Sequence, residues 1–246
     1  MTNVSSLQKR AEACGIALDE KQLSAFERYK ELIVEWNDRI DITAITEDAA
    51  IEEKHFLDSL SVFRNLPAGR GFRVIDIGTG GGFPGVPMKI YDPSLHMTLF
   101  DSLQKRIRFL QEVIEECSLT DTEAIHGRAE EFFHLEAYRD RFDVAVSRAV
   151  APFATLLEYC LPAVRVGGVF LAMKGPAIDE ELSVVQPALE ALGGRIEQID
   201  SFQWTSERYE RNIVVVKKMR PTPKKYPRGQ GKPRKSPLIL NKQERA

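Results

Sequence analysis

The sequence is poor in cysteine and histidine and has no long apolar run. Its three cysteines, Cys14, Cys117 and Cys160, lie far apart, and its four histidines show no metal-ligand spacing. We therefore expect neither a disulfide framework nor a bound metal ion. No segment approaches the roughly 18 uncharged apolar residues of a membrane helix, and the N-terminus has no stretch typical of a signal peptide. These absences predict a cytoplasmic protein with no membrane partner.

Most of the chain can form a full core, whereas its C-terminus is strongly basic. The chain has 246 residues, of which 43% are hydrophobic, so it can bury a core without disulfides or metals. Residues 217–246 hold 11 of the 34 basic residues but one of the 36 acidic residues. A basic run with several prolines is typical of an extended chain. The sequence therefore predicts a cationic arm over residues 220–246 that does not pack into the core.

The arm is a candidate nucleic-acid interface, because a tyrosine among basic residues offers both phosphate pairing and base stacking. The candidate RNA-binding residues are Lys224, Lys225, Tyr226, Arg228, Lys232, Arg234 and Lys235. The alternative interpretation is a solvated end without a ligand.

Residues 73–85, RVIDIGTGGGFPG, predict a buried strand that runs into a glycine-rich loop. So many residues without a Cβ indicate a backbone that passes close to a ligand. Gly80, Gly82 and Gly85 match the dinucleotide pattern G-x-G-x-x-G. Asp76, however, would oppose a pyrophosphate, whereas it suits the cationic ammonium and sulfonium end of S-adenosylmethionine.

A second acidic residue ends the next predicted strand. Asp101 lies 21 residues after Gly80, where an acid can accept hydrogen bonds from both ribose hydroxyls. Nicotinamide cofactors and S-adenosylmethionine both carry that ribose. The alternative is that Asp76 caps a helix and Asp101 stabilises a turn. The two acids together indicate a nucleoside site.

Hydrophobic periodicity divides the chain into three parts. Residues 19–40 and 48–63 predict two helices, the first capped by Asp19, in a helical N-terminal part over residues 1–71.

In residues 72–219 strands and helices alternate, and residues 103–117 form the clearest helix. The predicted strands are residues 72–77, 97–101, 123–126, 142–147, 168–174, 195–202 and 212–218. Since no helix separates the last two strands, they should form a hairpin that makes the final strand antiparallel. This predicts an α/β fold with a doubly wound, seven-stranded, Rossmann-like sheet, as in class I methyltransferases.

Several segments together resemble the small-subunit (16S) ribosomal RNA guanine-N7 methyltransferases, the glucose-inhibited division protein B family. They are DIGTGGGFPG (76–85), DSLQKR (101–106), GRAE (127–130) and SRAVA (147–151), with flanking WN (36–37), HFLDSL (55–60), KG (174–175), YPR (226–228) and GKP (231–233). The resemblance covers nearly the whole chain. It implies S-adenosylmethionine as cofactor and 16S ribosomal RNA or the small ribosomal subunit as partner.

The resemblance also implies roles for individual residues. Gly78, Gly80 and Phe83 would line the methionine end and the adenosine, Asp101 the ribose, and Ala129 and Glu130 the adenine edge. Ser102 would also bind the cofactor. Arg148 would lie at the cofactor site, although it could equally hold the guanine or a phosphate, or form a surface salt bridge. His55 is expected to be a packing residue.

The chemistry of guanine N7 explains which motifs are missing. The sequence after the fourth predicted strand contains neither the N/D-P-P-Y/F tetrapeptide of amine methyltransferases nor the Pro-Cys of cytosine-C5 enzymes. Guanine N7 has a free lone pair and no proton to remove, so placement against the methyl group can carry most of the catalysis. No catalytic residue is therefore assigned.

Two other functions stay open on the residues alone. One is a nicotinamide or flavin oxidoreductase, and the other is a non-catalytic RNA-binding ribosome assembly factor. For the methyltransferase, deletion of the arm is expected to weaken RNA binding and to leave cofactor affinity nearly unchanged.

Overall fold

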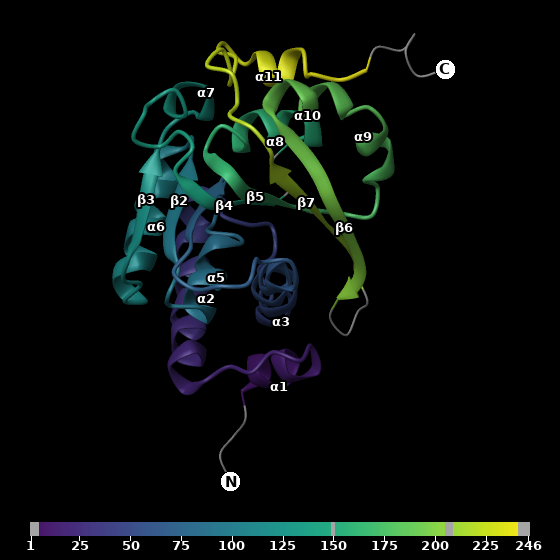
Figure 1. Ribbon diagram of the computed structural model, residues 1–246. Coiled ribbons are helices and arrows are strands. Elements are labelled where there is room, and N and C mark those ends of the chain that lie inside the picture. The colour runs from purple at the N-terminus through teal and green to yellow at the C-terminus, as the bar shows by residue number, and fades with distance from the viewer. Residues whose placement is uncertain (1–4, 149–150, 205–208, 241–246) are drawn as a thin grey trace.

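A seven-stranded sheet runs through the computed structural model, which describes residues 5–148, 151–204 and 209–240 (Figure 1). Its strands are β1 (Arg73–Ile77), β2 (His96–Asp101), β3 (Thr122–His126), β4 (Phe142–Arg148), β5 (Val164–Lys174), β6 (Gly194–Trp204) and β7 (Tyr209–Lys218). The strand order is β3-β2-β1-β4-β5-β7-β6. The first five strands are parallel, and β7 is antiparallel to both β5 and β6. The predicted strands and the antiparallel hairpin are confirmed.

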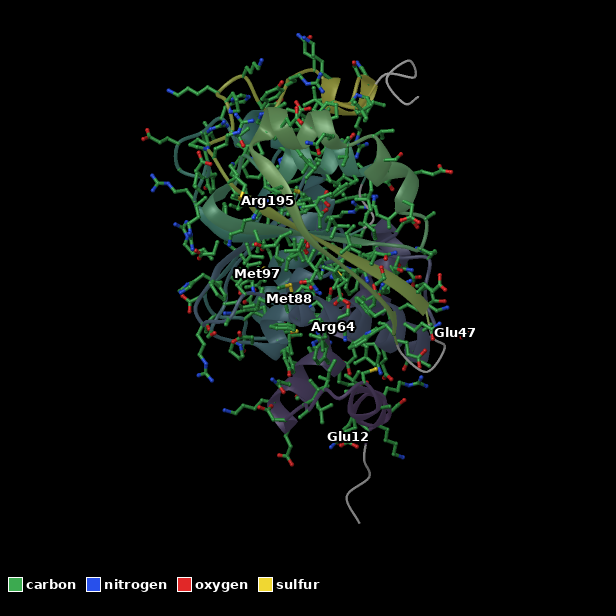
Figure 2. All side chains as sticks on the ribbon, turned by 45° about the vertical axis from the view of Figure 1, so that its right-hand side comes forward. Glu12, Glu47, Arg64, Met88, Met97 and Arg195 are labelled. Carbon is green, nitrogen blue, oxygen red and sulfur yellow. The ribbon has the colours of Figure 1, made fainter. Side chains whose placement is uncertain are left out.

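Helices cover both faces of the sheet. The sheet domain contains α5 (Gly85–Tyr91), α6 (Gln104–Glu116), α7 (Ala129–Phe132), α8 (Phe153–Cys160), α9 (Asp179–Ser183), α10 (Gln186–Leu192) and the short C-terminal α11 (Lys232–Lys235). Successive strand residues enter opposite layers: Val74 packs in the layer of α5 and α6, and Ile75 in the layer of α8 and α10. Met88 and Met97 lie in the interior (Figure 2), where both are almost completely buried.

The N-terminal part contains two helices within residues 5–40. The predicted long helix is confirmed as α2 (Glu20–Ile40), and Asp19 and Gln22 form a reciprocal capping box with two hydrogen bonds of 2.8 Å. A shorter helix, α1 (Ser6–Ala13), precedes it and is capped by Ser5. The periodicity did not reveal α1, which is one of the short elements that depend on packing against the rest of the fold.

Residues 48–64 form the second predicted helix as one continuous helical stretch with three hydrogen-bond patterns. It consists of α3 (Asp48–Ile51), the π-helix η1 (Glu52–Leu57), α4 (Asp58–Leu60) and the 3₁₀-helix η2 (Ser61–Arg64). The π-helical turn is a feature that often occurs at functional sites. It contains His55, which faces the sheet as described below.

The C-terminal segment, residues 219–240, corrects the expectation of an arm that does not pack. The segment lies over α8 and α10 (yellow in Figure 1), and Thr222, Tyr226 and Pro233 are buried. Arg139 donates to the backbone carbonyls of Thr222 (2.7 Å) and Tyr226 (2.9 Å). The expectation was wrong because a few buried residues and backbone carbonyls anchor the segment, while its lysines stay in solvent.

Among the residues that the structure describes, no helix has the length and apolar character of a membrane span.

Candidate cofactor site

A cavity of about 280 Å³ opens where β1, β2 and β3 end. Ligands of doubly wound folds bind at this carboxyl edge. Five of the predicted cofactor-binding residues line it: Gly78, Asp101, Ser102, Ala129 and Glu130. The structure therefore brings together the residues assigned to the ribose and the adenine edge, which follow β2 and β3, with Gly78, which follows β1.

Asp101 organises the loops around this cavity. The residue is 2% exposed, and its Oδ2 accepts hydrogen bonds from the Gly80 backbone (2.9 Å) and from Arg106 Nη1 (3.2 Å). Oδ1 accepts from the Leu103 backbone at 2.9 Å, which is the turn stabilisation considered as an alternative. A carboxylate oxygen can accept two hydrogen bonds, so Oδ1 can also accept a ribose hydroxyl. The two interpretations of Asp101 are compatible.

The glycines of the loop serve different purposes. A Cβ on Gly81 would lie 2.5 Å from Ile42, one on Gly82 would lie 2.6 Å from Val86, and one on Gly85 would lie 2.4 Å from Leu99. These three glycines therefore make room for protein atoms. Gly80 differs, because its Cβ would meet only the Gly78 carbonyl oxygen, at 4.0 Å. Of these four glycines, Gly80 is therefore the one that best fits a close approach to a ligand.

Asp76 is completely buried below the loop. Its Oδ2 accepts hydrogen bonds from Thr79 Oγ1 (2.7 Å) and from the Gly85 backbone (2.8 Å), the first residue of α5. Oδ1 has no hydrogen-bond partner among the described residues. Burial raises the pKa of this carboxyl group to about 7, although the bonds from Thr79 and Gly85 oppose the increase. Asp76 therefore shapes the loop, and its orphaned oxygen fits the cationic end of S-adenosylmethionine.

Phe83 and Arg148 lie in a second cluster, with His55. The His55 and Phe83 rings stack at 4.3 Å, and the Arg148 guanidinium lies 4.9 Å from the centre of the Phe83 ring. Arg148 donates to Asp58 Oδ2 (2.9 Å) and to His55 Nδ1 (3.1 Å). Arg211 Nε donates to Asp58 Oδ1 at 2.6 Å. Arg148 thus joins β4 to the helical stretch through a salt bridge with Asp58, as the alternative expected, but this salt bridge is part-buried and not at the surface.

His55 packs as expected, but both of its ring nitrogens also have polar partners. Because Arg148 donates to Nδ1, the ring proton lies on Nε2, which donates to Thr43 Oγ1 at 2.7 Å. Burial and the Arg148 charge lower the His55 pKa to about 3. His55 is therefore neutral at physiological pH, because its protonated form loses the proton well below pH 7.

Sequence reasoning missed several residues of these two groups. Tyr159, Gly231 and Arg234 line the cavity, but they come from distant segments with no common spacing, and Arg234 was expected only to bind RNA. Asp58 is part of the HFLDSL segment that contributes to the family resemblance, but the sequence indicated no role for it. Ala149 and Val150 of the SRAVA segment lie outside the described residues.

The RNA-binding candidates fall into two groups. Five side chains are exposed: Lys224, Lys225, Lys232, Arg234 and Lys235. Tyr226 is 7% exposed, which does not allow the base stacking expected of it. Arg228 forms an ion pair with the buried Glu158 at 2.8 Å. Tyr226 and Arg228 therefore hold the C-terminal segment on the fold.

Comparison with known proteins shows the family. Residues 22–214 match the family model described as rRNA small subunit methyltransferase G. A ribosomal RNA small subunit methyltransferase G of Clostridium novyi (strain NT) is 46% identical over 95% of this chain and 96% of its own length. One from Acetivibrio thermocellus is 48% identical over 93% of each chain. The chain belongs to this family. It is therefore an enzyme, a methyltransferase of ribosomal RNA with S-adenosylmethionine as cofactor, and the oxidoreductase and non-catalytic alternatives are set aside.

Solved structures agree on the fold. A SAM-dependent methyltransferase from Aquifex aeolicus is similar with a TM-score of 0.51 and 17% identity, over 72% of this chain and 96% of that one. The [4+2]-cyclase SpnF has a TM-score of 0.54 and 14% identity, over 82% of this chain and 97% of that one. A cyclase shares the architecture, so the likeness shows the class I methyltransferase fold and says nothing of the substrate. In the described part of the chain, no three His, Cys, Asp or Glu side chains gather as a metal site would require.

Proposed function

We propose that this chain transfers a methyl group from S-adenosylmethionine to N7 of a guanine in small-subunit ribosomal RNA. The resemblance of its motifs to the guanine-N7 methyltransferases supports this target. The name of its relatives, ribosomal RNA small subunit methyltransferase G, supports the small-subunit RNA as the substrate. The same proposal places the protein in the cytoplasm, with its ribosomal RNA substrate.

The observation that carries the proposal is the pair of adjoining groups at the carboxyl edge of the sheet. Asp101 and Glu130 in the cavity suit the ribose and the adenine, and Asp76 Oδ1 suits the cationic methionine end. The glycine loop leads from the cavity to Phe83, Arg148 and His55. We assign the second cluster to the methyl-acceptor side of the site.

The chemistry of the second cluster suits an acceptor that loses no proton. S-adenosylmethionine supplies an electrophilic methyl group, and guanine N7 offers a lone pair in the plane of the base. His55 cannot act as a general base, because Arg148 and Thr43 occupy its two ring nitrogens and its pKa is lowered to about 3. Arg148, which is fixed by Asp58 and His55, can position the acceptor without taking part in proton transfer.

Transfer of a tritiated methyl group tests the proposal. We would offer naked 16S ribosomal RNA, an assembly intermediate and the mature small subunit as substrates, and treat the methylated RNA with borohydride and aniline. Cleavage at one guanine is expected, because N7-methylguanosine is sensitive to this treatment. Labelled RNA that resists cleavage would show that the target atom is not N7. Calorimetry with NADH, for which no binding is expected, serves as the control for nucleoside specificity.

A further inference from the structure

Two residues of the C-terminal segment lie at the cofactor cavity. Gly231 and Arg234 line it together with Tyr159 of α8, beside the residues that follow β1, β2 and β3. The predicted adenine residue Glu130 also lines the cavity, within hydrogen-bond distance of Tyr159. About seventy residues separate α8 from α11 in the sequence, so only the docking of the segment brings the two together.

The docking of the segment is built from buried contacts. Glu158 of α8 is completely buried, and its two oxygens accept hydrogen bonds from the Arg228 backbone (2.7 Å), Nε (2.9 Å) and Nη2 (2.8 Å). Thr155 Oγ1 donates to the Pro233 carbonyl at 2.9 Å. The segment is therefore attached on both sides of Gly231. Charge-assisted, bidentate contacts of this kind are strong and hold a specific geometry.

A chain of polar contacts links Arg234 to the adenine wall. The Tyr159 hydroxyl donates to Glu130 Oε1 at 3.3 Å. Burial and the Glu130 charge raise the Tyr159 pKa to about 12, and Arg234 opposes this increase through its charge and a hydrogen bond to the hydroxyl. Arg234 thus lies next to Tyr159 and Glu130 at the cavity, while its own side chain stays exposed.

We propose that the C-terminal segment forms one wall of the S-adenosylmethionine pocket and that Arg234 contacts the adenine ring. A carboxylate such as Glu130 accepts from the exocyclic amine of adenine, whereas a guanidinium donates to the ring nitrogens or stacks on the ring face. The two side chains are therefore complementary for this base. The inference rests on the proposed position of the cofactor, and it differs from the expectation that cofactor affinity is independent of the arm.

The matched pair Arg234→Ala and Lys235→Ala tests this in the full chain. Both side chains are exposed residues of α11, but only Arg234 lines the cavity. We would titrate each variant with S-adenosylmethionine, S-adenosylhomocysteine and adenosine by calorimetry. Arg234→Ala should weaken all three by a similar factor, roughly three- to tenfold, as for a cation–π contact or hydrogen bond at a partly exposed site. Lys235→Ala should bind all three like the wild type.

Four results would overturn the proposal or the site. Wild-type affinity of Arg234→Ala for all three ligands, or equal losses in Arg234→Ala and Lys235→Ala, would show that Arg234 does not contact the adenine. A loss for S-adenosylmethionine and S-adenosylhomocysteine, but not for adenosine, would place Arg234 at the amino-acid end of the cofactor. If the wild type bound none of the three ligands, the cofactor site itself would be wrong. If Arg234→Ala lowers the melting temperature, Arg234→Lys is the second variant, because it keeps the charge and loses the planar group. Weaker binding of all three ligands by Arg234→Lys at a wild-type melting temperature would show that a contact is lost and not the fold.

Discussion

Single residues decide whether the glycine loop serves the fold or the ligand. Gly80 and Gly82 both have positive φ, at 61° and 100°. A Cβ on Gly82 would come within 2.7 Å of the Tyr29 hydroxyl and 2.6 Å of Val86, whereas one on Gly80 would meet only the Gly78 carbonyl oxygen, at 4.0 Å. The two positions therefore form a matched pair for mutation.

Gly80→Val should abolish binding of S-adenosylmethionine and leave the fold intact, because the added branch occupies the ligand's space. The left-handed backbone adds a strain of about 1–2 kcal/mol. Gly82→Val should instead destabilise the protein by roughly 2–5 kcal/mol through overpacking and strain. Calorimetry and urea unfolding separate the two effects. Normal cofactor affinity in Gly80→Val would contradict the assignment of Gly80 to the ligand.

Asp76 predicts a pH dependence of stability. Its folded-state pKa is raised to about 7 from a usual value of 3.8, so the fold favours the protonated form. The unfolding free energy should therefore fall as pH rises from about 4 to 7 and stay level above that. Asp76→Asn should remove this decrease. The lowered pKa of His55 acts in the opposite direction, because it makes the unfolding free energy rise with pH below the usual histidine pKa. The informative quantity is therefore the difference between wild type and variant, measured by urea unfolding at pH 5 and 7.5. An equal slope in both proteins would contradict the prediction.

The rate of methyl transfer should be insensitive to pH. No proton leaves guanine N7, and the His55 pKa of about 3 lies far below the assay range. Single-turnover rates at saturating cofactor and RNA should therefore stay nearly flat between about pH 6 and 8.5. A steep increase near neutrality would point to an acceptor that must be deprotonated. Arg148→Ala should reduce rate or affinity without changing the shape of the profile.

At the scale of elements, Asp58 joins three of them. It lies at the start of α4 directly after the π-helix, and it pairs with Arg148 of β4 (2.9 Å) and Arg211 of β7 (2.6 Å). Its side chain is only 6% exposed. A π-helical turn cannot be recognised from a period of 3.6 residues, so the sequence predicted the extent of this stretch and not its local geometry.

Asp58→Ala should destabilise the protein by roughly 3–5 kcal/mol, because two part-buried guanidinium groups lose the carboxylate between them. Asp48→Ala in the same helical stretch is the control: Asp48 is 69% exposed in its ion pair with Lys30, so a change below about 1 kcal/mol is expected. Urea unfolding gives both values. A similar small effect in both variants would show that the cluster does not hold these elements together.

At the scale of the whole molecule, the C-terminal segment presents an exposed basic face next to the cofactor cavity. Lys232 and Lys235 of α11 are exposed, and Arg234 between them lines the cavity. RNA that binds this face would therefore lie close to the cofactor. Burial of Tyr226 leaves charge, and not base stacking, as the means by which the segment can hold RNA.

The double variant Lys232→Ala/Lys235→Ala should bind ribosomal RNA more weakly and with a flatter salt dependence. Each lost phosphate contact reduces the slope of log affinity against log salt by about 0.7 to 0.9. Lys9→Ala/Lys21→Ala, two exposed lysines on α1 and α2, removes the same charge elsewhere and should keep the slope. Filter binding across a salt series measures it. Equal slopes in the two double variants would show that the face has no specific part in RNA binding.

The sequence by itself determined the type and order of nearly all elements, the final hairpin, the Asp19 cap of α2 and the family. These features follow from periods of two or 3.6 residues, or from motifs within one short segment, so they depend on neighbours along the chain. Only the tertiary structure decided that Arg148 meets His55, 93 residues away, and that the basic segment packs against α8. Such contacts depend on how layers pack and on which buried groups find partners, and no local pattern encodes that. The roles of Gly81, Gly82 and Gly85 were decided in the same way, by the protein atoms that surround them.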